Sequence, residues 1–208
     1  YPYTAPHSTV TGGLCTGVGI PLRRLNRVIG ALGVYNIKNV LGPYPTRIQE
    51  EGIRKQIKGL EEGAEIGWLD IPLARYAVLV NGIDEIALTR LSALDGFETI
   101  KICTAYQYKG KHYDIYTSDL DVLNNCECIY EELPGWQQDT TGIISFEALP
   151  ENAKRFIQRI EELLGVRIAS VSVGPDRNQI LSISSPVGAI VKMFSSSISS
   201  PVGRIQHN

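Results

Sequence analysis

Apolar positions three and four residues apart along the chain predict three amphipathic helices. They are expected over residues 22–32, 71–81 and 150–164. The second helix has Pro72 in its first turn and Gly82 at the position that commonly ends a helix. The apolar stripe of the third helix consists of Phe156, Ile157, Ile160, Leu163 and Leu164.

Other segments show the patterns of β-strands. Residues 84–91 form a short, mostly apolar run that predicts a buried strand. Residues 97–116 alternate apolar and polar side chains on both sides of a Lys-Gly-Lys sequence, which predicts a β-hairpin with one covered face. Residues 166–173 predict a strand that follows the third helix and ends in a Gly-Pro turn. Helix followed by strand is typical of an α/β fold, in which ligands bind at the carboxyl ends of the strands.

The C-terminal segment has a different character. The heptapeptide SISSPVG occurs at residues 182–188 and again at 197–203, within a serine-rich stretch that has little periodicity. We therefore expect one folded unit over residues 1–181 and a tail over 182–208 that is disordered or loosely attached.

Composition narrows the class of protein. The chain has 208 residues, and 20 Lys and Arg against 22 Asp and Glu give a net charge of −2, so a nucleic-acid partner is not indicated. No apolar run approaches the roughly 20 residues needed to cross a bilayer, and the first residues lack the features of a signal peptide. A soluble, cytoplasmic protein without membrane contact is expected. The four cysteines lack the spacing of a zinc site, so reduced thiols are expected at Cys15, Cys103, Cys126 and Cys128.

Candidate ligand motifs are few. The TGVGIPL sequence at 16–22 has two glycines at the spacing of a dinucleotide loop, but Leu22 stands in place of the third, so a simple turn in a Thr- and Gly-rich loop is favoured. No phosphate-loop or serine-nucleophile motif is present. The SVGPDR sequence at 172–177 offers backbone N–H groups and a hydroxyl at a strand end, although it also suits an ordinary turn. The loop around Trp136 is either anchored by that ring or part of a pocket.

Several sequences occur in one order that resembles the adenylosuccinate synthetase family. They are GGLCTGVGIP, GPYPT, GWLD, ALTRL, KICTAYQYKGK, YEELPGW, LPENAKRFIQRIEELLGV and SVGPDR. The resemblance covers residues 1–181 and corresponds to about the C-terminal half of a family member. It implies an α/β fold, namely the C-terminal portion of the synthetase fold, which is related to P-loop NTPases. A mostly parallel sheet with an antiparallel hairpin excursion is expected.

The resemblance also implies an activity. Family members ligate IMP and L-aspartate to adenylosuccinate in AMP biosynthesis, using GTP and Mg²⁺. The phosphate loop, the catalytic aspartate and histidine and the Mg²⁺ ligands of the family belong to the half that this chain is expected to lack. No catalytic or metal-binding residue is therefore assigned here.

Two sequences correspond to the family's guanine-binding positions. The family's Thr-Lys-Leu-Asp reads Thr89, Arg90, Leu91 and Ser92 in this chain. The second set of implied GTP contacts is Ser172, Val173 and Gly174. A serine hydroxyl cannot accept two hydrogen bonds in the way that the aspartate does, so weaker guanine selectivity is expected.

The implied substrate-binding positions depart from the family. Ala5 follows Thr4 where the family continues with threonine, and Lys38 with Asn39 replaces Arg-Val. Aligning the Gly-Ala pair at 63–64 with the family implies that its arginine-rich loop before Gly67 is deleted, since only Glu65 and Ile66 lie between Ala64 and Gly67. Carboxylates there, including Glu61 and Glu62, would repel L-aspartate.

Two hypotheses of different classes follow. The first is an incomplete synthetase that is inactive as the 208-residue chain. The second is a non-catalytic remnant that pairs with a full-length synthetase or forms a homodimer through an uncovered apolar surface. An incompletely translated product is a further alternative, suggested by the loop deletion and the repeated tail.

Overall fold

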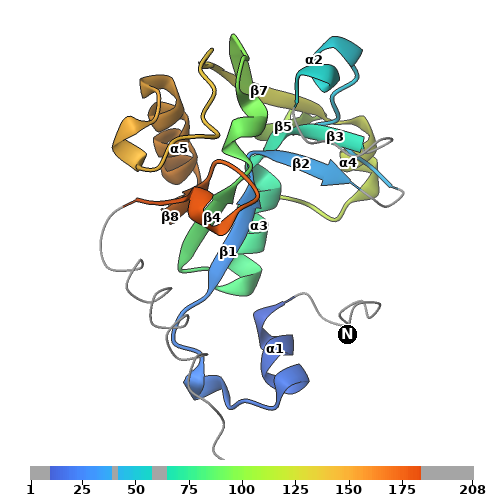
Figure 1. The fold of residues 1–208 in the computed structure, drawn as a ribbon. Coiled ribbons are helices and arrows are strands. Elements are labelled where there is room, and N and C mark those ends of the chain that lie inside the picture. Colours follow the sequence, from blue (N-terminus) through green and yellow to red (C-terminus); the bar gives the residue numbers. More distant parts are fainter. Residues whose placement is uncertain (1–9, 39–41, 58–64, 184–208) are drawn as a thin grey trace, which may run out of the picture.

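A parallel sheet lies at the centre of the fold. The computed structural model describes residues 10–38, 42–57 and 65–183. In it, strands β1 (Ile29–Gly33), β4 (Glu85–Thr89) and β8 (Arg167–Ser172) lie side by side in parallel, and the short β9 (Ile180–Ser182) adds an antiparallel strand to β8 (Figure 1). The carboxyl ends of β1, β4 and β8 therefore meet at one edge of the sheet.

The described residues form a second, mostly antiparallel sheet. Its strands run in the order β2 (Tyr35–Lys38), β3 (Glu65–Asp70), β5 (Thr99–Tyr108) and β6 (Lys111–Tyr113), with β7 (Glu127–Pro134) also paired to β5. Among the described strand pairs of this second sheet, only β3 and β5 are parallel. The β5–β6 hairpin turns through Lys109 and Gly110, which both have positive φ angles, 48° and 75°, as a two-residue hairpin turn requires.

Two helices cover the sheets. Helix α3 (Ile71–Asn81) begins at Asp70, whose carboxylate accepts a hydrogen bond from Leu73 N, and ends at Gly82 in the left-handed conformation. Helix α5 (Glu151–Leu164) buries its apolar stripe and ends at Gly165 in the same way. The shorter helices are α1 (Thr11–Val18), α2 (Glu51–Gln56) and α4 (Leu120–Asn125), with single 3₁₀ turns at Leu22–Arg24, Leu91–Leu94, Phe146–Ala148 and Arg177–Gln179.

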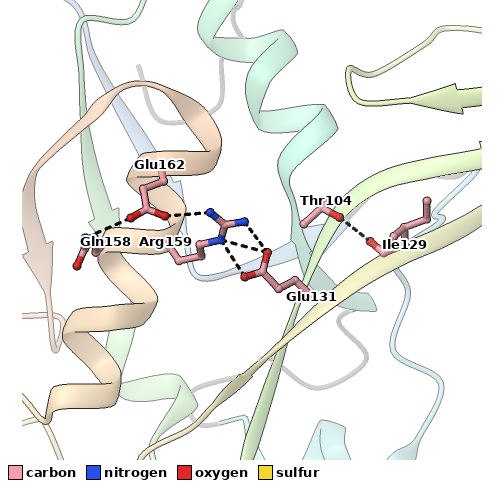
Figure 2. Close-up of polar contacts among 6 residues, drawn as sticks. All are labelled: Thr104, Ile129, Glu131, Gln158, Arg159 and Glu162. Carbon is pink, nitrogen blue, oxygen red and sulfur yellow. Dashed lines mark hydrogen bonds and ion pairs between the residues drawn. The ribbon is translucent and has the colours of Figure 1, made fainter.

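A salt-bridge network ties α5 to β7. The guanidinium of Arg159 makes a two-pronged contact with the carboxylate of Glu131 at 2.8 to 3.1 Å and a further one with Glu162 at 2.9 Å (Figure 2). In the same view, Thr104 donates its hydroxyl proton to Ile129 O at 3.2 Å. Thr104 occupies the irregular position of the β5–β7 ladder, so its hydroxyl compensates locally for the interrupted pairing.

The structure confirms most of the elements predicted from the sequence. The helices at 71–81 and 150–164, the strands at 84–91 and 166–173, and the hairpin all occur with small shifts at their ends. The α/β fold with a mostly parallel sheet and an antiparallel excursion is likewise confirmed. No helix of the described residues has the length and apolarity to span a membrane.

The predicted helix over residues 22–32 is wrong. One 3₁₀ turn covers Leu22–Arg24, and strand β1 covers Ile29–Gly33. Apolar residues three and four apart are compatible with either element over so short a segment, and glycines at 30 and 33 oppose a helix. Gly30 also faces Ile83 so closely that an added Cβ would lie 2.7 Å from the Ile83 side chain.

Other segments differ from expectation or cannot be compared. Residues 11–18 form α1 rather than the expected loop, and the GWLD tetrapeptide at 67–70 lies in β3, where no strand was expected. Helix α1 has no buried residue, and Thr11 joins it to the C-terminal end of α3 by three hydrogen bonds to Asn81. Strand β9 extends to Ser182; residues 184–208 of the expected tail lie outside the described structure.

Candidate functional site

The two sequences predicted to bind GTP meet at the carboxyl edge of the parallel sheet. Residues 90–92 follow β4, and residues 172–174 begin at the last residue of β8. The backbone N–H of Arg90 donates to the hydroxyl of Ser172 at 3.3 Å, which joins the two segments across 82 residues of sequence. Parallel pairing of β4 with β8 thus creates one site from two distant sequences.

Arg90 has an unusual backbone. Its φ of 67° is left-handed, a conformation that a residue with a Cβ rarely adopts. The guanidinium donates to the hydroxyl of Tyr35 at 2.9 Å and lies 5.7 Å from the centre of that ring. A strained residue at a strand end, with its charge held over an aromatic ring, is typical of a functional position.

A cavity of about 800 Å³, here called the strand-end cavity, opens beside these residues. Four of the six predicted GTP contacts line it: Arg90, Ser92, Ser172 and Gly174. The other two do not, because the side chains of Leu91 and Val173 are fully buried in the core.

The backbone of Val173 is also engaged. Its N–H donates to Gln179 O at 2.9 Å, so any ligand contact of Val173 would have to use its carbonyl group. By contrast, no hydrogen bond to the N–H of Gly174 is found in the described part of the chain.

Gln179 supports the turn that carries Gly174. Its Oε1 accepts a hydrogen bond from Asp176 N at 3.1 Å, and its Nε2 donates to Thr141 O at 2.9 Å. A Cβ on Gly174 would lie 2.1 Å from Oε1, so a larger residue at this position would displace the Gln179 side chain. Gln179 therefore joins the β8 turn to the loop that contributes Thr141 to the cavity wall.

A buried carboxylate holds that loop in place. Asp95 is 5% exposed and accepts hydrogen bonds from Trp136 Nε1 at 2.6 Å, from Thr140 N at 2.8 Å and from the Thr140 hydroxyl at 3.0 Å. The ring of Trp136 is buried and lies 5.8 Å from that of Phe156. Both interpretations of this loop therefore apply, since the buried ring of Trp136 anchors it and Thr141 lines the cavity.

A second cavity, here called the tyrosine cavity, has a volume of about 580 Å³. Its wall includes the tyrosines at 35, 44, 106 and 116 and the cation of Lys38. The ammonium of Lys38 donates to the carbonyl groups of Gly42 and Pro43. Tyr35, Thr89 and Arg90 line both cavities, so the two lie on either side of Arg90.

Asp70 contributes a buried carboxyl group to the tyrosine cavity. One oxygen accepts from Leu73 N at 3.0 Å and the other from the Tyr106 hydroxyl at 2.5 Å. Burial raises the pKa of Asp70 above its usual value, although these two hydrogen bonds oppose the shift. Burial also raises the pKa of Tyr106, so that hydroxyl stays protonated and donates to the carboxylate.

Sequence reasoning missed several of these positions. Tyr35 lines both cavities without belonging to any recognisable motif. Asp70 ends the GWLD tetrapeptide and Thr141 lies in the loop around Trp136, but neither residue was assigned a role. Asp176 and Arg177 belong to the SVGPDR sequence, so their place in the strand-end cavity could have been anticipated.

Some predicted substrate positions cannot be placed. Ala5, Asn39 and residues 58–64, where the arginine loop was judged to be missing, lie outside the described residues. Glu65 is described, and its carboxylate forms an ion pair with Arg47 at 2.8 Å. Its charge is therefore partly neutralised.

The cysteines are free thiols, and the described residues do not group possible metal ligands. None of the four cysteines forms a disulfide, and burial raises the pKa of Cys126 to about 11. Within residues 10–38, 42–57 and 65–183, no three His, Cys, Asp or Glu side chains are grouped as a metal site would require.

Comparison with known proteins identifies the lineage. Residues 1–181 match the family model for adenylosuccinate synthetase. The chain is 43% identical over 195 residues to the synthetase of Trichlorobacter lovleyi and 44% identical over 196 residues to that of Geotalea uraniireducens. These alignments cover 90% and 91% of this chain but 45% and 46% of the relatives, so the chain spans about half their length.

A solved structure agrees with this assignment. The fully ligated adenylosuccinate synthetase from Plasmodium falciparum is similar with a TM-score of 0.80 and 31% identity, over 88% of this chain and 46% of that one. The family match, the sequence identities and the shared fold lead to one conclusion: the chain belongs to the adenylosuccinate synthetase family.

Proposed function

We propose that these residues form the nucleotide-binding portion of an adenylosuccinate synthetase, the GTP-dependent ligase that joins IMP to L-aspartate in AMP biosynthesis. One observation carries the proposal. The hydrogen bond from Arg90 N to the Ser172 hydroxyl joins the two peptide segments that correspond to the family's guanine-binding positions. Both segments line the same 800 Å³ cavity at the carboxyl ends of parallel strands. Open α/β sheets bind their ligands at this edge.

The strand-end cavity is the proposed GTP site. Its proposed side-chain and glycine contacts are Arg90, Ser92, Ser172 and Gly174, which line it. Leu91 and Val173 would contribute backbone groups only, because their side chains are buried. The hydroxyl groups and the Gly174 N–H supply hydrogen bonds for a base. The cations of Arg90 and Arg177 supply favourable charge for a phosphate-bearing ligand.

The tyrosine cavity is the proposed place for the second nucleotide, IMP. Lys38 lines it and stands where the family has an arginine, so a positive charge is kept without the planar fork. The shared wall at Arg90 would bring the two nucleotides close together, as transfer of a phosphoryl group from GTP to IMP requires.

Catalysis by the 208 residues alone is not expected. They span about half the length of the curated relatives, and the family's catalytic aspartate and histidine have no assigned counterparts here. Among the described residues, no three His, Cys, Asp or Glu side chains are grouped to hold a Mg²⁺ ion. The purified chain mixed with IMP, GTP, L-aspartate and Mg²⁺ should form no adenylosuccinate, and product detected by mass spectrometry would refute this.

The nucleotide site itself can be tested without turnover. GTP binding measured by isothermal titration calorimetry should weaken at least tenfold in Arg90→Ala, because a cation and its contact with Tyr35 are lost. Arg155→Ala is the control, since Arg155 lies on the exposed face of α5 with 67% of its side chain exposed. Equal affinity in the parent and Arg90→Ala would contradict the site.

A second candidate function is supported by exposed apolar side chains. Helix α3 is mostly apolar, but not all of its apolar side chains are buried. Four of them remain 40% to 70% exposed: Leu73, Tyr76, Leu79 and Val80. Such a surface suits pairing with a full-length synthetase or with a second copy of the chain. Light scattering would detect a homodimer, and co-purification with an intact synthetase would detect the other pair. A chain that stays monomeric in both experiments would refute this function.

A further inference from the structure

The hydrogen-bonding groups of the strand-end cavity decide which purine it can select. Guanine presents N–H donors at both N1 and N2, whereas adenine presents an acceptor at N1 and a donor at N6. Selecting guanine therefore requires an acceptor for two adjacent N–H groups, and a carboxylate is the side chain that best provides it.

The described lining of the cavity offers one carboxylate, that of Asp176. Asp176 is exposed and caps the 3₁₀ turn at Arg177–Gln179, where its side chain accepts the backbone N–H of Gln179. Asp95 lies near the cavity but is buried, and its oxygens accept from Trp136 and Thr140. Asp95 is therefore occupied, and the exposed carboxylate of Asp176 rejects adenine only weakly, because water satisfies its oxygens when no guanine is bound.

Hydroxyl groups take the place of a carboxylate at the cavity wall. Ser92 lies in the 3₁₀ turn after Arg90 and lines the cavity; no hydrogen bond of its hydroxyl is found among the described residues. Ser172 accepts the N–H of Arg90 and keeps its own proton to donate. A hydroxyl that can rotate donates to adenine N1 as readily as it accepts from guanine N1–H.

We propose that the strand-end cavity is a purine site without guanine selectivity, which binds adenine and guanine nucleoside triphosphates with similar affinity. The inference rests on the proposed function, because it assumes that a nucleotide base occupies this cavity. A site rejects a ligand strongly only when its own polar groups are left unpaired, and the serine hydroxyls adapt to either base.

The test compares the affinities of GTP, ATP and CTP for the full 208-residue chain by isothermal titration calorimetry. GTP and ATP should bind within about threefold of each other, because neither leaves a fixed acceptor unpaired. CTP should bind at least about tenfold more weakly, because its smaller ring leaves part of the cavity wall without contact.

One substitution should create the missing selectivity. Ser92→Asp supplies a carboxylate at the cavity wall and should favour GTP over ATP by about 10- to 100-fold. Ser118→Asp adds the same charge at an exposed serine outside both cavities and should leave the ratio unchanged. Circular dichroism establishes that each variant is folded before its affinity is measured.

The outcomes separate the inference from the function on which it rests. A parent chain that prefers GTP by more than tenfold, or a folded Ser92→Asp that gains no preference, overturns the inference and leaves the nucleotide site in place. CTP bound as tightly as the purines overturns it as well, because the base is then not recognised. A parent chain that binds no nucleotide refutes the proposed function itself. If Ser92→Asp does not fold, the GTP-to-ATP ratio of the parent decides.

Discussion

The carboxylate of Asp95 is the most informative single group to remove. In Asp95→Ala, two buried N–H donors lose their acceptor: the indole of Trp136, which is 3% exposed, and the backbone of Thr140, which is fully buried. Each stranded donor costs about 1–3 kcal/mol, so we expect a loss of about 4 kcal/mol. Because many domains are stable by only about 5–15 kcal/mol, this loss should be large relative to the total.

Urea unfolding followed by far-ultraviolet circular dichroism measures this loss. The backbone signal is preferable to fluorescence because Asp95 contacts Trp136 directly. Asp95→Asn keeps one acceptor oxygen and should lose about half as much. The free energy of unfolding should fall with urea concentration at the same slope in the parent and in each variant, because only then does the comparison report stability alone.

A surface carboxylate provides the control. Asp114 is 71% exposed and lies 3.6 Å from Arg75, so Asp114→Ala should cost less than about 1 kcal/mol. If Asp95→Ala also costs less than about 1 kcal/mol, the buried hydrogen bonds do not carry the stability assigned to them. The Asp95 variants should in addition weaken nucleotide binding, because the loop they release carries Thr141 in the cavity wall.

Three further predictions test other contacts. Gly174→Ala should displace Gln179 and cost about 1–3 kcal/mol in urea unfolding, whereas Gly142→Ala, which meets no atom within 4 Å, should be neutral; equal losses would contradict the close approach. Arg159→Lys should cost less than about 1 kcal/mol because the ion pair is partly exposed, and a larger loss would show that its two-pronged geometry matters more than its exposure suggests. Burial raises the pKa of Asp70, so its contribution favours the fold at low pH and is lost as pH rises from about 4 through the raised pKa. The stability of the parent relative to Asp70→Asn should therefore fall over that range, and a difference that does not change with pH would refute the assignment.

Local signals in the sequence were sufficient for the elements that carry their own start and stop residues. Helix α3 has Pro72 in its first turn and Gly82 at its end, and both are found in these roles. The hairpin turns at Lys109 and Gly110 because that pair adopts the positive φ angles of a tight turn. These elements depend on backbone preferences within a few residues, so the sequence alone predicts them.

Segments whose neighbours are remote could not be assigned in this way. The residues of β1 show a spacing that also suits a helix, and their strand conformation depends on pairing with β4, more than fifty residues away. The same is true of β3, which pairs with β2 on one side and β5 on the other. Pattern alone does not contain the partner that selects one conformation over the other.

The amino-acid sequence determined the family, the main helices and the two short segments expected to bind a nucleotide. The tertiary structure decided how those segments act together, because only the pairing of β4 with β8 brings Arg90 to Ser172. It also decided which predicted contacts can face a ligand, since Leu91 and Val173 are turned into the core while Ser92 and Gly174 line the cavity. Burial and hydrogen-bond geometry are properties of the assembled fold, and no local spacing of residues encodes them.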